Sequence, residues 1–282
     1  MTARTGTASD HRVAVSLTFD FDAESAWIGS FKVETPSALS RGSYGAYEGV
    51  PRILRLLDKY ALPATFFIPG YTAELHPTET RDIAAAGHEI GHHGYIHEPP
   101  HLLSLDEERV MIERGLEALD KIVGVRPKGY RSPSWELSGN TFSLLAEYGF
   151  EYDASQLARD RPYWVEDAGK RTDLVEVPGA WELTDSSHFL FAYSPVYLTG
   201  LSAPSKVEEI WRADFDGAYE EGGDICYVLT MHPQIIGRHH RMAMLERIIA
   251  YILEHDDVWF AQMDDIANLF RGREAGGRRA AE

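Results

Sequence analysis

The fold of this chain is most strongly constrained by a regular alternation between short apolar segments and longer amphipathic segments. The short segments have the composition of buried β-strands, and the longer ones repeat apolar residues at the spacing of one helix face. This order indicates a parallel sheet or barrel with helices packed on it. Strands are expected at residues 13–20, 64–68, 225–229 and 258–262, and helices at 50–60, 78–86, 104–123, from 205 onward and at 242–254.

Two of these helices are expected to begin at a capping box, in which a Ser is followed three residues later by a Glu. The boxes are Ser104 to Glu107 and Ser205 to Glu208. In each, the two side chains would bond the free backbone N–H groups of the first helical turn.

The alternation continues from residue 12 to about residue 270 with no internal repeat and no linker, so one domain is predicted there. Hydrophobic residues make up 44% of the 282 residues, enough for a sizeable core. Residues 1–11 and 271–282 are predicted to be loose tails. Residues 154–204 are the least regular part, where loops or insertions are expected.

The net charge of −17 limits the partners that the chain can have. Nucleic-acid binding needs clustered Lys and Arg, and the 27 basic residues form no cluster, so nucleic acid is not expected. No apolar stretch reaches the length of a membrane span, and the first residues lack the apolar core of an export signal. We therefore expect a cytoplasmic protein with no membrane partner.

Two aspartates, Asp20 and Asp22, close the first predicted strand. Side chains two apart on a strand point the same way, so both carboxylates can face one site. In a parallel barrel the carboxyl ends of the strands form the active face. Neighbouring carboxylates repel each other, and a cation would relieve that repulsion. A solvated turn rich in aspartate explains these two residues equally well when they are taken alone.

Two metal-binding patterns overlap in the sequence GHEIGHHGYIHE at residues 87–98. His88 and His92 fit the H-E-x-x-H pattern of zinc peptidases, which requires a regular helix to bring both histidines to one face. Glycines at 87, 91 and 94 disfavour a helix, and a short strand is expected around Ile90. A zinc peptidase that uses His88 and His92 is therefore kept only as an alternative.

The second pattern, His93 and His97, follows this short strand. A loop or a single helical turn there would bring residues four apart to the same side. Two histidines and one aspartate leave a coordination position open for water, which is typical of a catalytic zinc or a similar divalent ion. Beside the aspartate pair, a metal site is favoured over two surface histidines. The predicted cofactor is one divalent metal ion, with zinc as the first candidate.

Four motifs, in this order along residues 13–270, resemble those of the polysaccharide deacetylase family of carbohydrate esterases. They are Thr18-Phe19-Asp20-Phe21-Asp22, His93-Gly94-Tyr95-Ile96-His97, Arg131-Ser132-Pro133 and Leu229-Thr230-Met231-His232-Pro233. The resemblance implies an α/β fold, a distorted (β/α) barrel of about seven parallel strands. It also implies an amidohydrolase of carbohydrate metabolism that cleaves carbon–nitrogen bonds other than peptide bonds.

The resemblance implies a role for each matching residue of the first three motifs. Asp22, His93 and His97 would bind the metal. Asp20 would be the general base that takes a proton from the attacking water. Arg131 would pair with Asp20 and tune its basicity.

The fourth motif would supply the general acid and part of the substrate pocket. His232 would protonate the leaving nitrogen, and Leu229 would line an acyl pocket with Trp135 or Trp181 nearby. The residue that orients His232 cannot be assigned. Glu176 is a poor candidate for it, because Glu176 reads as an ordinary strand residue.

One departure from the common motif points to a subgroup. Phe21 separates the two aspartates, which are adjacent in most members, and this spacing is similar to that of peptidoglycan deacetylase-like proteins, allantoinases and cyclic imide hydrolases. Without an export signal, a small amide or cyclic imide is at least as good a substrate as an N-acetyl sugar. The subgroup also implies a homo-oligomer. A non-catalytic binding protein of the same fold is a further alternative, and the intact motifs argue against it.

Overall fold

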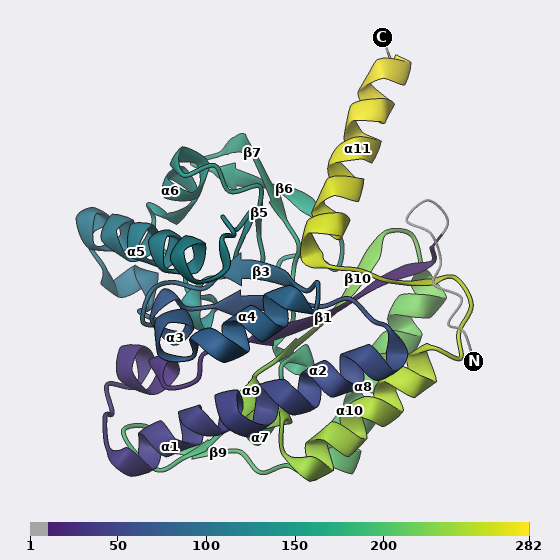
Figure 1. Cartoon of the computed structure of the whole chain (residues 1–282). Helices are drawn as coiled ribbons and strands as arrows, with labels where there is room; N and C mark the ends of the chain where they lie inside the picture. The colour runs from purple at the N-terminus through teal and green to yellow at the C-terminus, as the bar shows by residue number, and fades with distance from the viewer. Residues whose placement is uncertain (1–10, 282) are drawn as a thin grey trace.

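The centre of the fold is a sheet of nine strands that curls into an open barrel, seen in a computed structural model that describes residues 11–281 (Figure 1). The strand order is β10-β1-β2-β3-β4-β5-β7-β6, with β11 also paired to β1. Every pairing is parallel except that of β6 with β7. The strands are β1 (Val13–Asp20), β2 (Thr65–Ile68), β3 (Glu89–His92), β4 (Gly129–Tyr130), β5 (Tyr152–Asp153), β6 (Tyr163–Asp167), β7 (Lys170–Glu176), β10 (Ile225–Met231) and β11 (Val258–Phe260). The predicted distorted barrel is therefore confirmed.

Strand β1 is the central element of the sheet. It pairs with β10 along almost its whole length, while its other edge pairs with β11 at the start and with β2 at the end. All eight residues of β1 are buried. Apolar side chains from Val13 to Phe19 face the helices on one side, and Ser16, Thr18 and Asp20 face the interior of the barrel on the other. The inner face of β1 thus becomes polar toward its carboxyl end.

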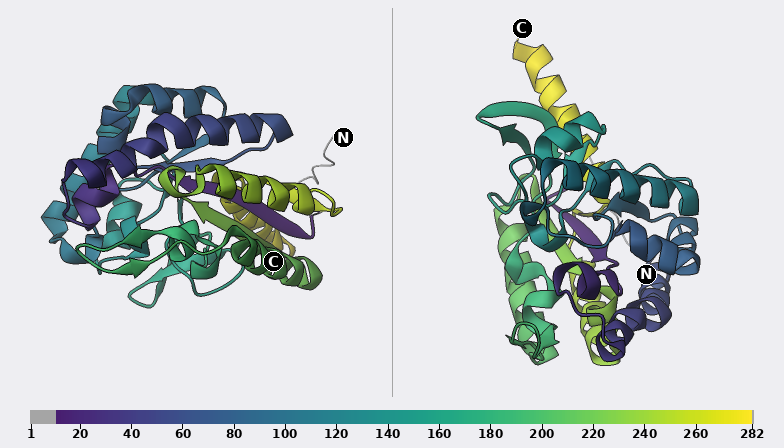
Figure 2. Two further views of the ribbon diagram at one scale, coloured as in Figure 1. Left: turned by 90° about the horizontal axis from the view of Figure 1, so that it is seen from below. Right: turned by 90° about the vertical axis from the view of Figure 1, so that its left-hand side faces the viewer.

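Helices lie on opposite sides of the central strand (Figure 2). Helix α2 packs Val50, Ile53 and Leu57 into the core, as its apolar spacing predicts. The helices are α1 (Pro36–Tyr44), α2 (Val50–Tyr60), α3 (Gly70–Leu75), α4 (Pro77–Ala85), α5 (Leu105–Val123), α6 (Thr141–Glu147), α7 (Asp185–Phe189), α8 (Pro204–Glu221), α9 (Pro233–Ile236), α10 (His239–Ile252) and α11 (Met263–Ala281). Single π or 3-10 turns are η1 (Ala26–Ser30), η2 (Gly45–Gly49), η3 (Pro100–Leu102), η4 (Pro133–Trp135) and η5 (Trp181–Leu183).

One of the two predicted capping boxes is confirmed. Ser104 and Glu107 bond each other's backbone N–H groups at the start of α5. The second prediction is wrong, because α8 begins at Pro204 and Ser205 lies inside its first turn. Proline has a fixed φ and no N–H group to satisfy, so it starts a helix without a side-chain cap.

The predicted tails are only partly described. Residues 1–10 lie outside the described part of the chain. From Met263 the chain forms helix α11, which continues to Ala281 and projects from the body of the molecule (Figure 1), and the loose end expected from Arg271 stays a prediction. Among the described residues, no helix is long and apolar enough to cross a membrane.

The least regular part of the sequence, residues 154–204, forms a series of short elements. These are the β6–β7 hairpin, the turn η5, the helix α7 and a second hairpin made of β8 (Phe191–Ala192) and β9 (Leu198–Thr199). An isolated parallel bridge between Thr184 and Thr230 holds the start of α7 beside β10. This bridge brings an irregular segment next to the fourth sequence motif.

Candidate active site and metal centre

Asp20 and Asp22 both point into the barrel at the carboxyl end of β1, as the period of a strand predicts, and both are buried. Oδ1 of Asp20 accepts a hydrogen bond of 2.6 Å from Nη1 of Arg131. Its Oδ2 lies 3.9 Å from Nε2 of His93 and 4.0 Å from Nε2 of His232. One oxygen of Asp20 is thus fixed by an arginine, and the other faces the site.

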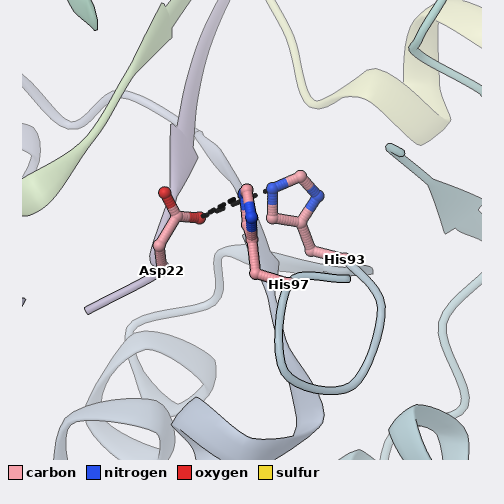
Figure 3. Close-up of side chains that lie close together, drawn as sticks. All are labelled: Asp22, His93 and His97. Atoms are coloured by element: carbon pink, nitrogen blue, oxygen red, sulfur yellow. Dashed lines mark ion pairs between the residues drawn. The ribbon is translucent and has the colours of Figure 1, made fainter. Parts of the chain in front are cut away.

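Asp22, His93 and His97 form one cluster with their donor atoms within 4.8 Å of one another. Oδ1 of Asp22 lies 3.4 Å from Nε2 of His93 and 3.7 Å from Nε2 of His97 (Figure 3). This oxygen is buried and has no hydrogen-bond partner among the described residues. A carboxylate and two imidazoles that converge in this way fit a divalent cation such as zinc.

The orientation of both imidazoles is set by hydrogen bonds at their other nitrogen. Nδ1 of His93 lies 2.7 Å from the carbonyl oxygen of Arg131, and Nδ1 of His97 lies 2.6 Å from Oγ of Ser30. Both Nε2 atoms are therefore directed at Asp22. Such outer partners fix the tautomer and the ring plane of metal-binding histidines. The sequence interpretation did not identify Ser30.

His97 sits in an unusual backbone conformation, with φ of +61°. A non-glycine residue in this left-handed region is strained and persists only where the surroundings hold it. Gly29 of η1 packs against it so closely that an added Cβ would lie 2.7 Å from the carbonyl oxygen of His97. The turn η1 thus holds both the backbone of His97 and, through Ser30, its ring.

The alternative metal pair, His88 and His92, is not brought together. Residues Glu89–His92 form strand β3 rather than a helix. On an extended strand, residues four positions apart such as His88 and His92 are separated by roughly 13 Å, whereas one helical turn would bring them to the same face. The ring of His92 packs on the outer side of the sheet, with Nε2 3.1 Å from the carbonyl oxygen of Ile112. The zinc-peptidase alternative is therefore not favoured.

The electrostatics of the cluster favour an ionised Asp22 beside a neutral His97. Burial raises the pKa of Asp22, but His97, His93 and His232 outweigh it and hold this pKa well below its usual range. Burial lowers the pKa of His97 to about 4, although Asp22 opposes the shift. A carboxylate and a neutral imidazole are the forms that bind a metal ion.

Arg131 is fully buried. Besides Asp20, Nη1 donates to Oγ1 of Thr18 and Nε donates to the carbonyl oxygen of Ala154. The guanidinium also lies 4.1 Å above the ring of Phe67. These contacts fix the arginine and, through it, the carboxylate of Asp20.

His232 is held by Asp185, a residue that the sequence analysis did not find. Oδ1 of Asp185 lies 2.6 Å from Nδ1 of His232, and Oδ2 accepts from the backbone N–H of His232 at 2.9 Å. Burial lowers the pKa of His232, but Asp185, Asp22 and Asp20 raise it to about 9 overall. The weak candidate Glu176 instead lies on β7 and accepts a hydrogen bond from the backbone of Gln156.

A cavity of about 790 Å³ opens from this cluster. Trp135 and Trp181 line it, with their ring centroids 4.7 Å apart. The prediction for Leu229 is wrong, because its side chain is packed in the core between sheet and helices. Residues alternate along β10, so Thr230 and His232 line the cavity while Leu229 points to the opposite side.

The chain was compared with known proteins. The model of the family "polysaccharide deacetylase" matches residues 9–152. The peptidoglycan deacetylase of Helicobacter pylori is 33% identical over 93% of this chain and 97% of its own length. This chain belongs to the polysaccharide deacetylase family. Members of the family are hydrolases of carbon–nitrogen bonds other than peptide bonds, so the predicted class of enzyme is confirmed.

Solved structures of this family share the fold over nearly the whole chain. A Mycobacterium smegmatis protein assigned to the polysaccharide deacetylases is 40% identical, with a TM-score of 0.89 over 97% of this chain and 96% of its own. An allantoinase is 28% identical, with a TM-score of 0.79 over 93% of this chain and 91% of its own. The chain is thus similar both to proteins named as deacetylases and to one named as an allantoinase.

Proposed function

We propose that this polysaccharide deacetylase family member is a metal-dependent amidohydrolase that opens a carbon–nitrogen bond of a small amide or cyclic imide. Asp22, His93 and His97 would hold one divalent ion, with zinc as the first candidate. The observation that carries the metal site is the buried, unpaired Oδ1 of Asp22 facing two Nε2 atoms at 3.4 and 3.7 Å. Such an ion supplies Lewis acidity, which acidifies water and polarises a carbonyl group.

Asp20 is the proposed general base. Its Oδ2 is free to take a proton because the bond from Arg131 occupies Oδ1. Oδ2 lies within 4.0 Å of both His93 and His232, between the proposed metal cluster and the proposed general acid. Arg131 acts as a positioning residue, since it bonds to Asp20 but does not line the cavity.

His232 is the proposed general acid. Its Nε2 faces the site, 3.8 Å from Oδ2 of Asp22, while Nδ1 is engaged by Asp185. A proton on Nε2 can pass to the leaving nitrogen, and the Asp185 carboxylate stabilises the imidazolium before the transfer. Acid and base steps each contribute roughly 10²–10⁴-fold to the rate.

The size and lining of the cavity support a small substrate. Sites for small molecules enclose roughly 300–1,000 Å³ and are mostly apolar with a few polar groups. The cavity of about 790 Å³ lies in this range, and aromatic side chains such as Trp27, Trp135 and Trp181 form its walls. The structural likeness to an allantoinase agrees with a small cyclic substrate.

N-deacetylation of a sugar is the second candidate, favoured by the full-length match to the Helicobacter pylori peptidoglycan deacetylase. The discriminating experiment assays one purified sample on allantoin, small cyclic imides and N-acetylglucosamine oligomers, before and after chelation. We expect turnover of a small amide or imide that chelation abolishes. Release of acetate from the oligomers alone would favour the second candidate, and turnover that survives chelation would contradict the metal site.

A further inference from the structure

The cavity has a cationic end that the proposed chemistry does not use. Arg41, Arg238 and Arg241 line it, together with His240 at the rim. Among the described residues that line this cavity, Asp20 and Asp22 are the carboxylates, and both belong to the metal end. The chain carries 44 acidic residues against 27 basic ones, so three arginines at one end of a cavity are not what its composition favours. The carboxylate of Asp185 attracts Arg241, but both of its oxygens are already bonded to His232.

Arg241 is the buried member of this cluster, with a fractional exposure of 7%. Its Nη1 donates to the carbonyl oxygen of Ile235 at 2.9 Å, and the guanidinium lies 4.5 Å above the ring of Phe189. Its Nε is buried and has no hydrogen-bond partner among the described residues. A buried N–H of a charged group is costly to leave unpaired, so a ligand that brings an acceptor to this atom would be stabilised.

The other two arginines are held in place by aromatic rings rather than by acids. Arg41 lies 4.6 Å from the ring centroid of Trp27, and Arg238 lies 3.5 Å from that of Tyr44. Within the described part of the chain, no carboxylate oxygen lies within 4.0 Å of the guanidinium of Arg41, Arg238 or Arg241. Stacking positions each guanidinium, and Nη2 of Arg41 also donates to the carbonyl oxygen of Phe191. The remaining N–H groups are available to a ligand.

The cluster is also electrostatically unfavourable in the absence of an anion. Burial lowers the pKa of Arg41, and the charge of Arg238 lowers it further. Burial and then the charges of Arg241 and Arg238 lower the pKa of His240. An oxyanion would relieve this repulsion and bind the planar guanidinium groups through paired hydrogen bonds.

We propose that the substrate is an anionic amide or imide whose carboxylate or phosphate is bound by Arg41, Arg238 and Arg241 while its scissile bond lies beside Asp20 and His232. This inference rests on the proposed function and narrows its substrate class. The apolar body of the substrate packs between the aromatic walls. The arginines select the anionic member of any pair of amides that differ only in charge.

The test uses matched pairs of probes with the full chain loaded with zinc. Hydantoin-5-acetic acid is compared with its methyl ester, N-acetylphenylalanine with its methyl ester, and N-acetylglucosamine 6-phosphate with N-acetylglucosamine. Binding is measured by calorimetry and turnover by release of product. The variants are Arg238→Gln, which is exposed, and Arg41→Gln, with Arg55→Gln on the exposed side of α2 as the matched control.

We expect at least one anionic probe to bind more tightly than its neutral partner, and this preference to fall roughly ten- to a hundred-fold in Arg238→Gln and Arg41→Gln. Arg55→Gln should keep the preference for the anionic probe. The probe pair that shows this arginine-dependent preference identifies the bound anion as a carboxylate or a phosphate. Equal binding within every pair, or a preference that survives both variants, would overturn the proposal. Arginine-dependent binding with no turnover of any probe would support the anion site and count against the proposed hydrolysis instead.

Discussion

Asp185 forms two hydrogen bonds with His232, one to Nδ1 of the ring at 2.6 Å and one to the backbone N–H at 2.9 Å. The carboxylate is fully buried, and it is held beside β10 by the bridge between Thr184 and Thr230. Both the ring plane and the tautomer of His232 therefore depend on one side chain from a distant, irregular segment. In our mechanism this pair is what makes His232 an acid directed at the site.

Replacing Asp185 by Asn should lower kcat by about 10²-fold or more, because the amide cannot stabilise the imidazolium. KM should change little, since Asp185 does not line the cavity. The measurement is steady-state kinetics with Glu182→Gln, an exposed acid of the same segment, as control. A variant with normal kcat would show that His232 does not need this partner.

Replacing Ser30 by Ala should weaken zinc binding by about 10- to 100-fold, because Ser30 orients the ring of His97 from outside the cluster. Calorimetric titration of the metal-free protein measures this directly. Ser37→Ala, at an exposed position of α1, is the control and should bind as the unmodified chain does. Unchanged affinity in Ser30→Ala would mean that η1 holds His97 through its backbone alone.

Replacing Glu176 by Gln should change how stability depends on pH. Glu176 and Asp153 are buried register partners on β7 and β5, and burial followed by the charge of Asp153 raises the pKa of Glu176 well above its ordinary value of 4.5. The folded state therefore keeps a proton that the unfolded chain releases. This contribution to stability is complete below pH 4.5 and is lost as the pH rises through the folded value.

The free energy of unfolding of Glu176→Gln should therefore exceed that of the unmodified chain by a margin that grows from pH 5 to pH 8. Denaturant titrations across this range give the comparison. Glu166→Gln, exposed on the neighbouring strand β6, should track the unmodified chain. Parallel curves for Glu176→Gln and the unmodified chain would contradict the raised pKa.

Local patterns were enough to predict the elements that carry the metal cluster. The two-residue period of a strand placed Asp20 and Asp22 on one side, and the glycines around Ile90 argued correctly against a helix. The same period, had it been applied to β10, would have placed Leu229 opposite His232. That prediction came from the motif and not from the geometry of the strand.

Asp185 could not be found in the same way. It lies 47 residues before His232 in a segment without periodicity, and it reaches the site through tertiary contacts alone. The start of α8 was misplaced because Pro204 made a side-chain cap unnecessary. Long-range placement and irregular backbone are thus where sequence patterns were insufficient.

Leu229→Ala tests the corrected position of that side chain. Loss of a buried leucine from the core should lower the free energy of unfolding by about 2–5 kcal/mol. KM for any accepted substrate should stay the same, because the side chain faces away from the cavity. Chemical denaturation and kinetics on the same preparation separate the two effects. A raised KM with normal stability would return Leu229 to the pocket.

The central claim is that Asp22 binds the metal while Asp20 takes the proton. The most direct measurement is zinc content, together with turnover, in Asp22→Asn and Asp20→Asn, two identical changes two residues apart. We predict that Asp22→Asn loses both zinc and activity, whereas Asp20→Asn keeps one equivalent of zinc and loses roughly 10²–10⁴-fold in kcat. Zinc retained in Asp22→Asn, or full activity in Asp20→Asn, would contradict the account.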